Sequence, residues 1–281
     1  MISSILVGTD GSPQANVACD YAFRIANAFR APLTGIHVID ARMIEGPMLA
    51  DISGSIGASG YFSAYAPFQN LLRDKANAIE SAFRENAALH GVPVEFIQEI
   101  GHPFHVLHER QEKHDLIVLG RRGESESLSG DLIGSITDRM VRKAVKPCLI
   151  TPAKTLPMSR ILVACDNSPI ADRVLQTATE FAVRFDIPIV LLTATEQMDG
   201  KEGRQTLQKA CALAERCGKI AEKTILSEGD AADAILASAS DENCNLIIMG
   251  AHGHSRVREW FVGCTSMRVL ADSALPILLV R

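Results

Sequence analysis

The chain has 281 residues, of which 47% are hydrophobic and 22% charged, a composition typical of a globular protein with room for two domains. A net charge of −5 and an aromatic content of 5% argue against a basic surface for nucleic acid or anionic lipid, and against stacking platforms for single strands. The seven scattered cysteines lack a C-x-x-C pair, no apolar run approaches the roughly 18 residues of a membrane span, and the first residues read as a strand rather than a signal peptide. We therefore expect a cytoplasmic protein with reduced thiols that binds neither nucleic acid nor membrane.

Strand and helix patterns alternate along the first half of the chain. Runs rich in Val, Ile and Leu predict strands at 5–10, 32–40, 94–101, 115–120 and 147–152. Apolar residues at helical spacing predict helices at 12–29, 71–91, 102–114 and 135–145. Unbroken apolar strands are typical of a parallel sheet that is covered on both faces.

Segment 41–70 interrupts this alternation. It is rich in Gly, Ser and Ala, and we expect a plain surface loop, with a flexible cover as the alternative.

The second half repeats the alternation. Strands are predicted at 161–166, 189–195, 223–228, 245–250 and 277–281, and helices at 171–185, 204–217, 231–242 and 265–272. This order predicts an α/β fold with a doubly wound parallel sheet in each half.

Three stretches of sequence occur twice. ILVGTDGSPQA at 5–15 returns as ILVACDNSPIA at 161–171, DLIVLGRRG at 115–123 returns as NLIIMGAHG at 245–253, and KPCLITP at 146–152 corresponds to LPILLVR at 275–281. The repeat predicts two tandem domains, 1–153 and 159–281, joined by a short polar linker, with the second domain lacking a segment like 41–70.

Glycines follow the fourth strand of each half. In an open α/β sheet, ligands bind beyond the carboxyl ends of the strands, and Gly120 and Gly250 lie at such an end. A glycine-bearing loop then leads to a helix start at 134–137 and again at 263–266. Main-chain N–H groups and the helix dipole favour an anion there, and Ser135 or Thr137 would add a hydroxyl donor.

The alternative interpretation is an ordinary turn with a serine N-cap, but the pattern occurs twice, each time after a buried strand. We therefore predict a nucleotide phosphate site. Neither the P-loop motif nor a G-x-G-x-x-G at the first helix is present.

With these motifs, both halves resemble the universal stress protein family. Its nucleotide-binding members carry G-x2-G-x9-G-[S/T] after the fourth strand and an aspartate at the end of the first strand. The resemblance covers nearly the whole chain. It implies a Rossmann-like domain similar to the adenine nucleotide alpha hydrolases, which binds ATP or AMP, with Mg²⁺ as a further candidate.

Carried over by position, the resemblance implies a set of nucleotide-binding residues in each half. In the first half they are Asp10, His37, Val38, Gly120, Arg121, Gly123, Gly134, Ser135, Ile136 and Thr137. In the second half they are Asp166, Thr193, Ala194, Gly250, Gly253, Gly263, Cys264 and Thr265.

Each half departs once from the family motif. Ten residues instead of nine separate Gly123 from Gly134, and Cys264 replaces the hydroxyl residue after Gly263. A thiol is a weak donor, so we expect the first half to be the better nucleotide site. Family members often pair through their last strands. The resemblance therefore implies an intramolecular pseudo-dimer in which 147–152 meets 277–281, with a homodimer as a further option.

Several residues admit two interpretations. Asp10 and Asp166 suit a ribose hydroxyl or Mg²⁺, against the alternative of a carboxylate that accepts local N–H bonds. Arg121 and Arg122 could clamp a phosphate or be solvated. A pair of histidines, at 252 and 254, is expected to belong to the loop and not to a metal site, because a third ligand is lacking.

No catalytic constellation is recognisable in the chain. The expected function is that of a cytoplasmic stress-response protein that binds ATP or AMP and acts as a sensor or regulator. Two alternatives stay open. One is a slow ATPase or phosphotransferase that uses the same sites, and the other is a pair of degenerate domains that bind a protein partner or a small apolar ligand.

Overall fold

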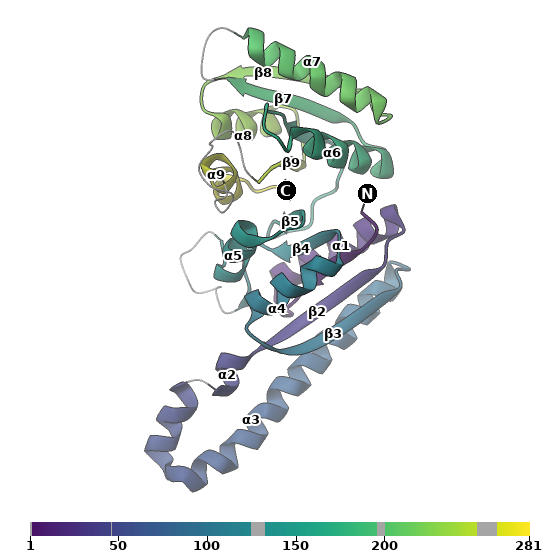
Figure 1. Cartoon of the computed structure of the whole chain (residues 1–281). Helices are drawn as coiled ribbons and strands as arrows, with labels where there is room; N and C mark the ends of the chain where they lie inside the picture. The colour runs from purple at the N-terminus through teal and green to yellow at the C-terminus, as the bar shows by residue number, and fades with distance from the viewer. Residues whose placement is uncertain (1, 46, 125–132, 196–199, 252–262) are drawn as a thin grey trace.

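A computed structural model describes residues 2–45, 47–124, 133–195, 200–251 and 263–281, with the backbone alone for 45–66. Its strands are β1 (Ile5–Gly8), β2 (Leu33–Asp40), β3 (Val94–Gly101), β4 (Leu116–Gly120), β5 (Cys148–Thr151), β6 (Ile161–Ala164), β7 (Ile189–Thr195), β8 (Lys223–Glu228), β9 (Leu246–Gly250) and β10 (Ile277–Val280). They form one sheet in the order β3-β2-β1-β4-β5-β10-β9-β6-β7-β8 (Figure 1). Each half has the order 3-2-1-4-5 of a doubly wound sheet, so the expected fold class is confirmed.

The two halves meet along a single antiparallel strand pair. Strand β5 pairs with β10 in the register Leu149 to Leu278, whereas the other strand pairs in the sheet are parallel. Both of these leucines are fully buried. The seam confirms the expected pairing of the last strands and covers two edges that would otherwise be open to other chains.

Helices cover both faces of the sheet. They are α1 (Pro13–Phe29), α2 (Ala41–Glu45), α3 (Pro47–Leu89), α4 (Pro103–Arg110) with the short η1 (Gln111–Lys113), α5 (Ser135–Lys143), α6 (Ala171–Phe185), α7 (Lys201–Arg216), α8 (Ala231–Asp241) and α9 (Cys264–Asp272). Buried side chains of α1, α3, α6 and α7 form one core cluster with the strands. Those of α4, α5, α8 and α9 form the other.

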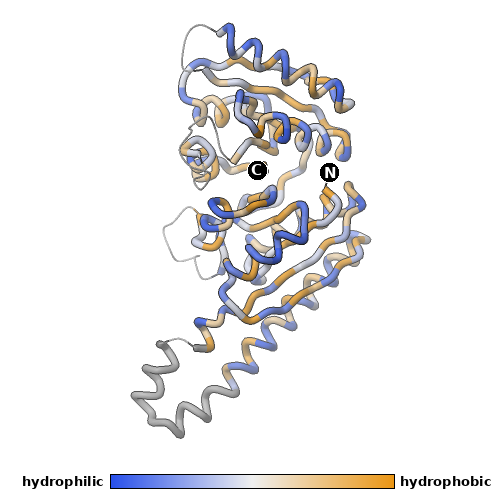
Figure 2. The backbone as a smooth tube through the Cα atoms, viewed as in Figure 1, coloured by the Kyte–Doolittle hydropathy of each residue, from blue (hydrophilic) through white to orange (hydrophobic). Residues whose placement is uncertain are grey.

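The hydropathy colouring follows this layering. In Figure 2 the strands are mostly orange, and α7 alternates between blue and orange, as expected for a helix with one buried face. No helix in the described part of the chain is long and apolar enough to cross a bilayer. The seven cysteines all lie in the described ranges and are free thiols.

The start of α1 fixes the chain at the carboxyl end of β1. Ser12 caps the helix, its side chain accepting the N–H of Ala15 at 3.2 Å, and Pro13 follows at the first helical position. Arg30, in the left-handed region with φ of 53°, ends the helix. The cap leaves Asp10 and Gly11 in the short turn between strand and helix.

Segment 41–70 is not a loop, so the expectation from its composition was wrong. Helix α2 begins directly after β2, and α3 spans Pro47–Leu89 with Pro67 inside it. Figure 1 shows that α3 bends sharply before its long straight part. Pro47 is at the first helical position, where an N–H group would have no partner within the helix, so proline loses no hydrogen bond there. Glycine costs only about 1 kcal/mol per position in a helix, so the Gly and Ser residues did not end it. In Figure 1 α2 and the first part of α3 extend away from the sheet.

Candidate functional site

A cavity of about 300 Å³ lies beyond the carboxyl ends of β1, β2 and β4, beside the start of α5. Strand order reverses between β1 and β4, which is where ligands bind in such sheets. Eight of the residues predicted for the first half line it: Asp10, His37, Val38, Gly120, Gly123, Ser135, Ile136 and Thr137. The chain thus brings together residues that are up to 127 positions apart, from Asp10 to Thr137.

Asp10 fastens the glycine loop to the end of β1. One carboxylate oxygen accepts the N–H of Ser12 at 2.9 Å, and the other accepts the N–H of Glu124 at 2.6 Å. A Cβ on Gly123 would lie 2.8 Å from the second oxygen. A side chain at position 123 would therefore displace the carboxylate. Asp10 makes the local N–H bonds of the alternative interpretation and also forms part of the cavity wall.

His37 ties the end of β2 to the end of β1. Its Nδ1 lies 2.8 Å from the carbonyl oxygen of Thr9, and the side chain is 7% exposed. Burial lowers the pKa of the imidazole. Because a carbonyl can only accept, Nδ1 carries the proton of the neutral ring. In the second half Thr193 makes the same connection, its hydroxyl donating to the carbonyl of Cys165 at 3.0 Å.

The start of α5 faces the cavity, but two of its predicted donors are already used. The N–H of Gly134 donates to the carbonyl of Arg121 at 2.9 Å. The hydroxyl of Thr137 donates to the carbonyl of Gly120 at 2.8 Å. These bonds join the start of α5 to the end of β4. Gly134, the N-cap residue, makes no side-chain cap, and the main-chain N–H groups of the first turn have no acceptor within the helix itself.

The second half has the same arrangement at α9. The N–H of Gly263 donates to Ala251 at 3.0 Å, and the hydroxyl of Ser266 donates to Gly250 at 2.9 Å. Ser266 therefore plays the part of Thr137, a role that the sequence analysis did not assign.

Arg121 does not line the cavity, and its predicted contact with a phosphate does not match its position. Its guanidinium donates to the carbonyl oxygens of Ser273 at 2.5 Å and Leu275 at 3.5 Å, both in the second half. Burial lowers its pKa. Arg121 therefore holds the two halves together. Arg122 does line the cavity, and its main-chain N–H donates to the side chain of Gln14 at 2.9 Å.

The cavity also has charged residues that the sequence analysis missed. Lys75 of α3 forms an ion pair with Glu124, and Arg42 of α2 forms one with Asp40. The bond to Arg42 lowers the pKa of Asp40. All four line the cavity. Lys75 and Arg42 belong to the helices that follow β2, far in sequence from the glycine loop. No motif in the sequence therefore indicated that they would line the same cavity as that loop.

The predicted residues of the second half lie at the corresponding strand ends. Asp166 accepts the N–H of Ser168 at 3.0 Å, as Asp10 does with Ser12. Ala194 and Gly250 lie at the carboxyl ends of β7 and β9. Cys264 and Thr265 are the first residues of α9, and Cys264 is exposed. Gly253, like the histidines at 252 and 254, lies outside the described residues. Within the described ranges no group of three residues could hold a metal ion.

One protein family matches both halves of the chain. The model of the universal stress protein family matches residues 1–152 and 158–281. A universal stress protein of Synechocystis is 28% identical over 290 residues, covering all of both chains. One from Mycobacterium tuberculosis is 22% identical and covers 99% of this chain and 96% of its own. A solved universal stress protein of Archaeoglobus fulgidus is similar in fold, with a TM-score of 0.78, 21% identity, and coverage of 100% of this chain and 99% of its own.

Proposed function

The chain belongs to the universal stress protein family, and we propose that it binds one adenine nucleotide, ATP or AMP, in the cavity of its first half. The nucleotide's phosphates would lie at the first turn of α5, and its base near the end of β2. Binding would make the protein a sensor or regulator in a stress response rather than a metabolic enzyme.

The observation that carries this proposal is the convergence of eight predicted residues on one cavity at the strand-order switch. Main-chain N–H groups at the start of α5 offer donors to phosphate oxygens. Arg122, Lys75 and Arg42 line the same space as further cationic groups, Lys75 paired with Glu124 and Arg42 with Asp40. At about 300 Å³ the cavity is within the range of small-molecule sites.

Solved universal stress proteins that match 44% of this chain have been described in complex with cAMP and with dAMP. Their TM-scores of 0.38 carry no weight for this chain, so the proposal rests on the chain's own residues. Mg²⁺ bound with a triphosphate would take its ligands mainly from phosphate oxygens and water, with Asp10 as the nearby carboxylate of the cavity wall.

Two matched substitutions test the proposal. Val38 lines the cavity at the end of β2, and Ala194 occupies the corresponding position at the end of β7; both are half-buried. Val38→Trp would fill the first cavity, whereas Ala194→Trp makes the equivalent change in the second half. Isothermal titration with ATP, ADP and AMP then gives affinity and stoichiometry.

We expect one nucleotide per chain, loss of at least tenfold in affinity for Val38→Trp, and wild-type binding for Ala194→Trp. Circular dichroism checks that both variants fold. Absence of binding to the folded wild-type protein, or full binding by folded Val38→Trp, would refute the proposal.

A further inference from the structure

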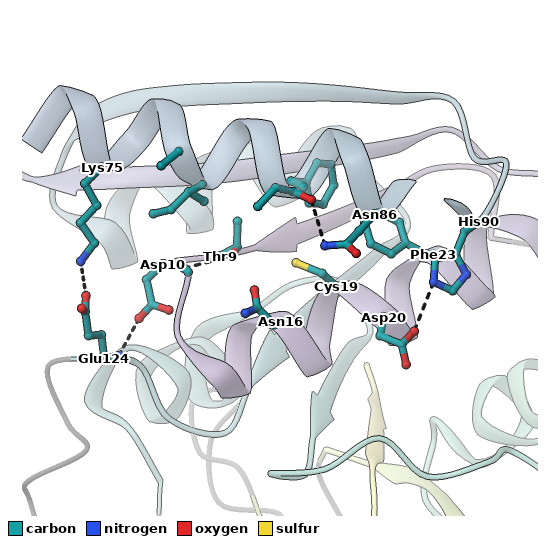
Figure 3. A pocket seen from close by; sticks show the side chains of 15 residues that line it. Thr9, Asp10, Asn16, Cys19, Asp20, Phe23, Lys75, Asn86, His90 and Glu124 are labelled. Atoms are coloured by element: carbon teal, nitrogen blue, oxygen red, sulfur yellow. Dashed lines mark hydrogen bonds and ion pairs between the residues drawn. The ribbon is translucent and has the colours of Figure 1, made fainter. Parts of the chain in front are cut away.

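A second cavity, of about 420 Å³, lies between α1 and α3 on one face of the sheet (Figure 3). It shares Thr9, Asp10, Lys75 and Glu124 with the nucleotide cavity, and then extends along the two helices to Asp20. The Lys75–Glu124 ion pair and Asp10 therefore form a common wall between the two spaces. The function proposed above uses only one of them.

The cavity has charged groups at both ends and a mixed lining between them. Ile79, Ala82 and Phe83 of α3 are the apolar residues of the middle stretch, and Asn16 of α1 faces the same space. Phe23 lies at the far end, where its ring is 5.1 Å from that of Phe83 and 5.3 Å from that of His90. Figure 3 shows Asp10, Lys75 and Glu124 at one end, and Asp20 and His90 at the other. A ligand that fits this lining is long and polar at its ends, and carries both apolar and polar groups between them.

Carboxylates outnumber cations in the lining. Asp10 and Glu124 lie at one end and Asp20 at the other, and the one lysine of the lining, Lys75, is paired with Glu124. Asp20 also contacts Arg24 at 3.2 Å and His90 at 3.4 Å, so its charge is partly compensated. The length of the cavity follows from the helix that lines it. Asp20 lies eight residues beyond Ser12, and at about 1.5 Å per residue α1 separates them by roughly 12 Å.

The second half of the chain provides an internal comparison, because there a side chain occupies the corresponding space. Gly11 lines the cavity, and its counterpart is Asn167. The side chain of Asn167 accepts the hydroxyl of Thr206 at 3.0 Å and donates to Glu202 at 3.3 Å, which fastens α7 to the turn after β6. Aligned on the glycines that follow α3 and α7, Thr206 corresponds to Ile79.

Three lining residues of the first half also differ from their counterparts. Phe23 corresponds to Thr179, Phe83 to Ala210 and Asp20 to Gln176. Of the two halves, only the first thus has the aromatic pair and the carboxylate of Asp20, and the first is also the half with a glycine, Gly11, in the turn after its first strand.

We propose that the cleft between α1 and α3 binds a linear aliphatic polyamine. A primary ammonium group at one end meets Asp20, and the one at the other end meets Asp10 with Glu124. Between them the methylene groups contact Ile79 and Phe83, and the secondary ammonium group donates to the side-chain oxygen of Asn16. Ammonium groups are attracted both by carboxylates and by aromatic faces. This site does not depend on nucleotide binding.

Titration calorimetry with spermidine, in the absence of nucleotide, tests the proposal, with octane-1,8-diol as a neutral probe of the same length. Ala82 is exposed and lines the cleft, so Ala82→Phe would block it from the surface, whereas Ala88→Phe makes the same change at an exposed position of α3 outside the lining. Asp20→Asn removes the distal charge. Asp172→Asn removes one exposed charge from α6 as its control.

We expect one spermidine per chain and no measurable binding of the diol. Affinity should fall about tenfold in Asp20→Asn, as for loss of a charge-assisted hydrogen bond, and be lost in Ala82→Phe, while both controls bind as wild type. The proposal is overturned if spermidine does not bind, if the diol binds equally well, or if folded Ala82→Phe retains wild-type affinity. An equal loss in Asp172→Asn would also overturn it, because it would indicate attraction by net charge alone.

Discussion

Replacing Thr137 with valine tests whether its hydroxyl stabilises the start of α5 or serves as a hydrogen-bond donor to a bound phosphate. The hydroxyl donates to the carbonyl of Gly120 at 2.8 Å, and the residue is 5% exposed. Valine keeps the shape and has a similar helix propensity. The substitution therefore removes one buried hydrogen bond and leaves a carbonyl without that donor, which should lower the free energy of unfolding by about 1–2 kcal/mol.

A matched control separates this effect from helix propensity. Thr177 on α6 donates to the carbonyl of Arg173, also at 2.8 Å, but this bond is exposed and the residue is only half-buried. Thr177→Val should change the free energy of unfolding by less than about 0.5 kcal/mol. Urea unfolding followed by circular dichroism measures both. If Thr137→Val unfolds like the wild type yet loses nucleotide affinity, the hydroxyl is a ligand donor, and the structural role assigned to it is wrong.

Three further outcomes follow from the buried groups. Burial lowers the pKa of His37, so as the pH falls through about 6.5 this histidine is protonated in the unfolded chain before it is protonated in the folded one, and stability falls from there toward the folded pKa. In His37→Thr the difference between the urea midpoints at pH 7.5 and 5.5 should therefore be smaller than in the wild type. An equal difference would contradict this reasoning. Some dependence should remain, since burial shifts the pKa of His114 in the same direction. Leu278→Ala at the seam should cost about 2–5 kcal/mol in urea unfolding, and a cost under about 1 kcal/mol would show that the seam contributes little. Cys217 and Cys264 are exposed and should react rapidly with a thiol reagent. Burial raises the pKa of Cys19 to about 12, so Cys19 should react only when the protein unfolds. Rapid labelling of Cys19, detected by mass spectrometry, would contradict its burial.

The repeat in the sequence predicted most of the fold, because buried strands and amphipathic helices follow from the spacing of apolar residues. The seam between β5 and β10 was implied by a family resemblance and is confirmed by the register of Leu149 and Leu278. Segment 41–70 could not be predicted from composition. Glycine and serine lower helix propensity without forbidding a helix, so α3 continues through them.

The site was predictable where backbone conformation decides and not where distant side chains meet. Glycine at 120 is favoured because a Cβ there would lie 3.0 Å from the carbonyl oxygen of Gln14, a tight contact with backbone. The role of Arg121 depends on the second half, which lies across the seam and 152 residues away at Ser273. The ion pair of Lys75 with Glu124 likewise joins two elements that only the folded sheet brings together.

Crystals of the protein grown with AMP would test the central claim most directly. We expect electron density for one nucleotide in the first half, with its phosphate at the first turn of α5 and its base beside Val38 at the end of β2. Density confined to the second half, or a cavity that stays empty at saturating AMP, would contradict the account.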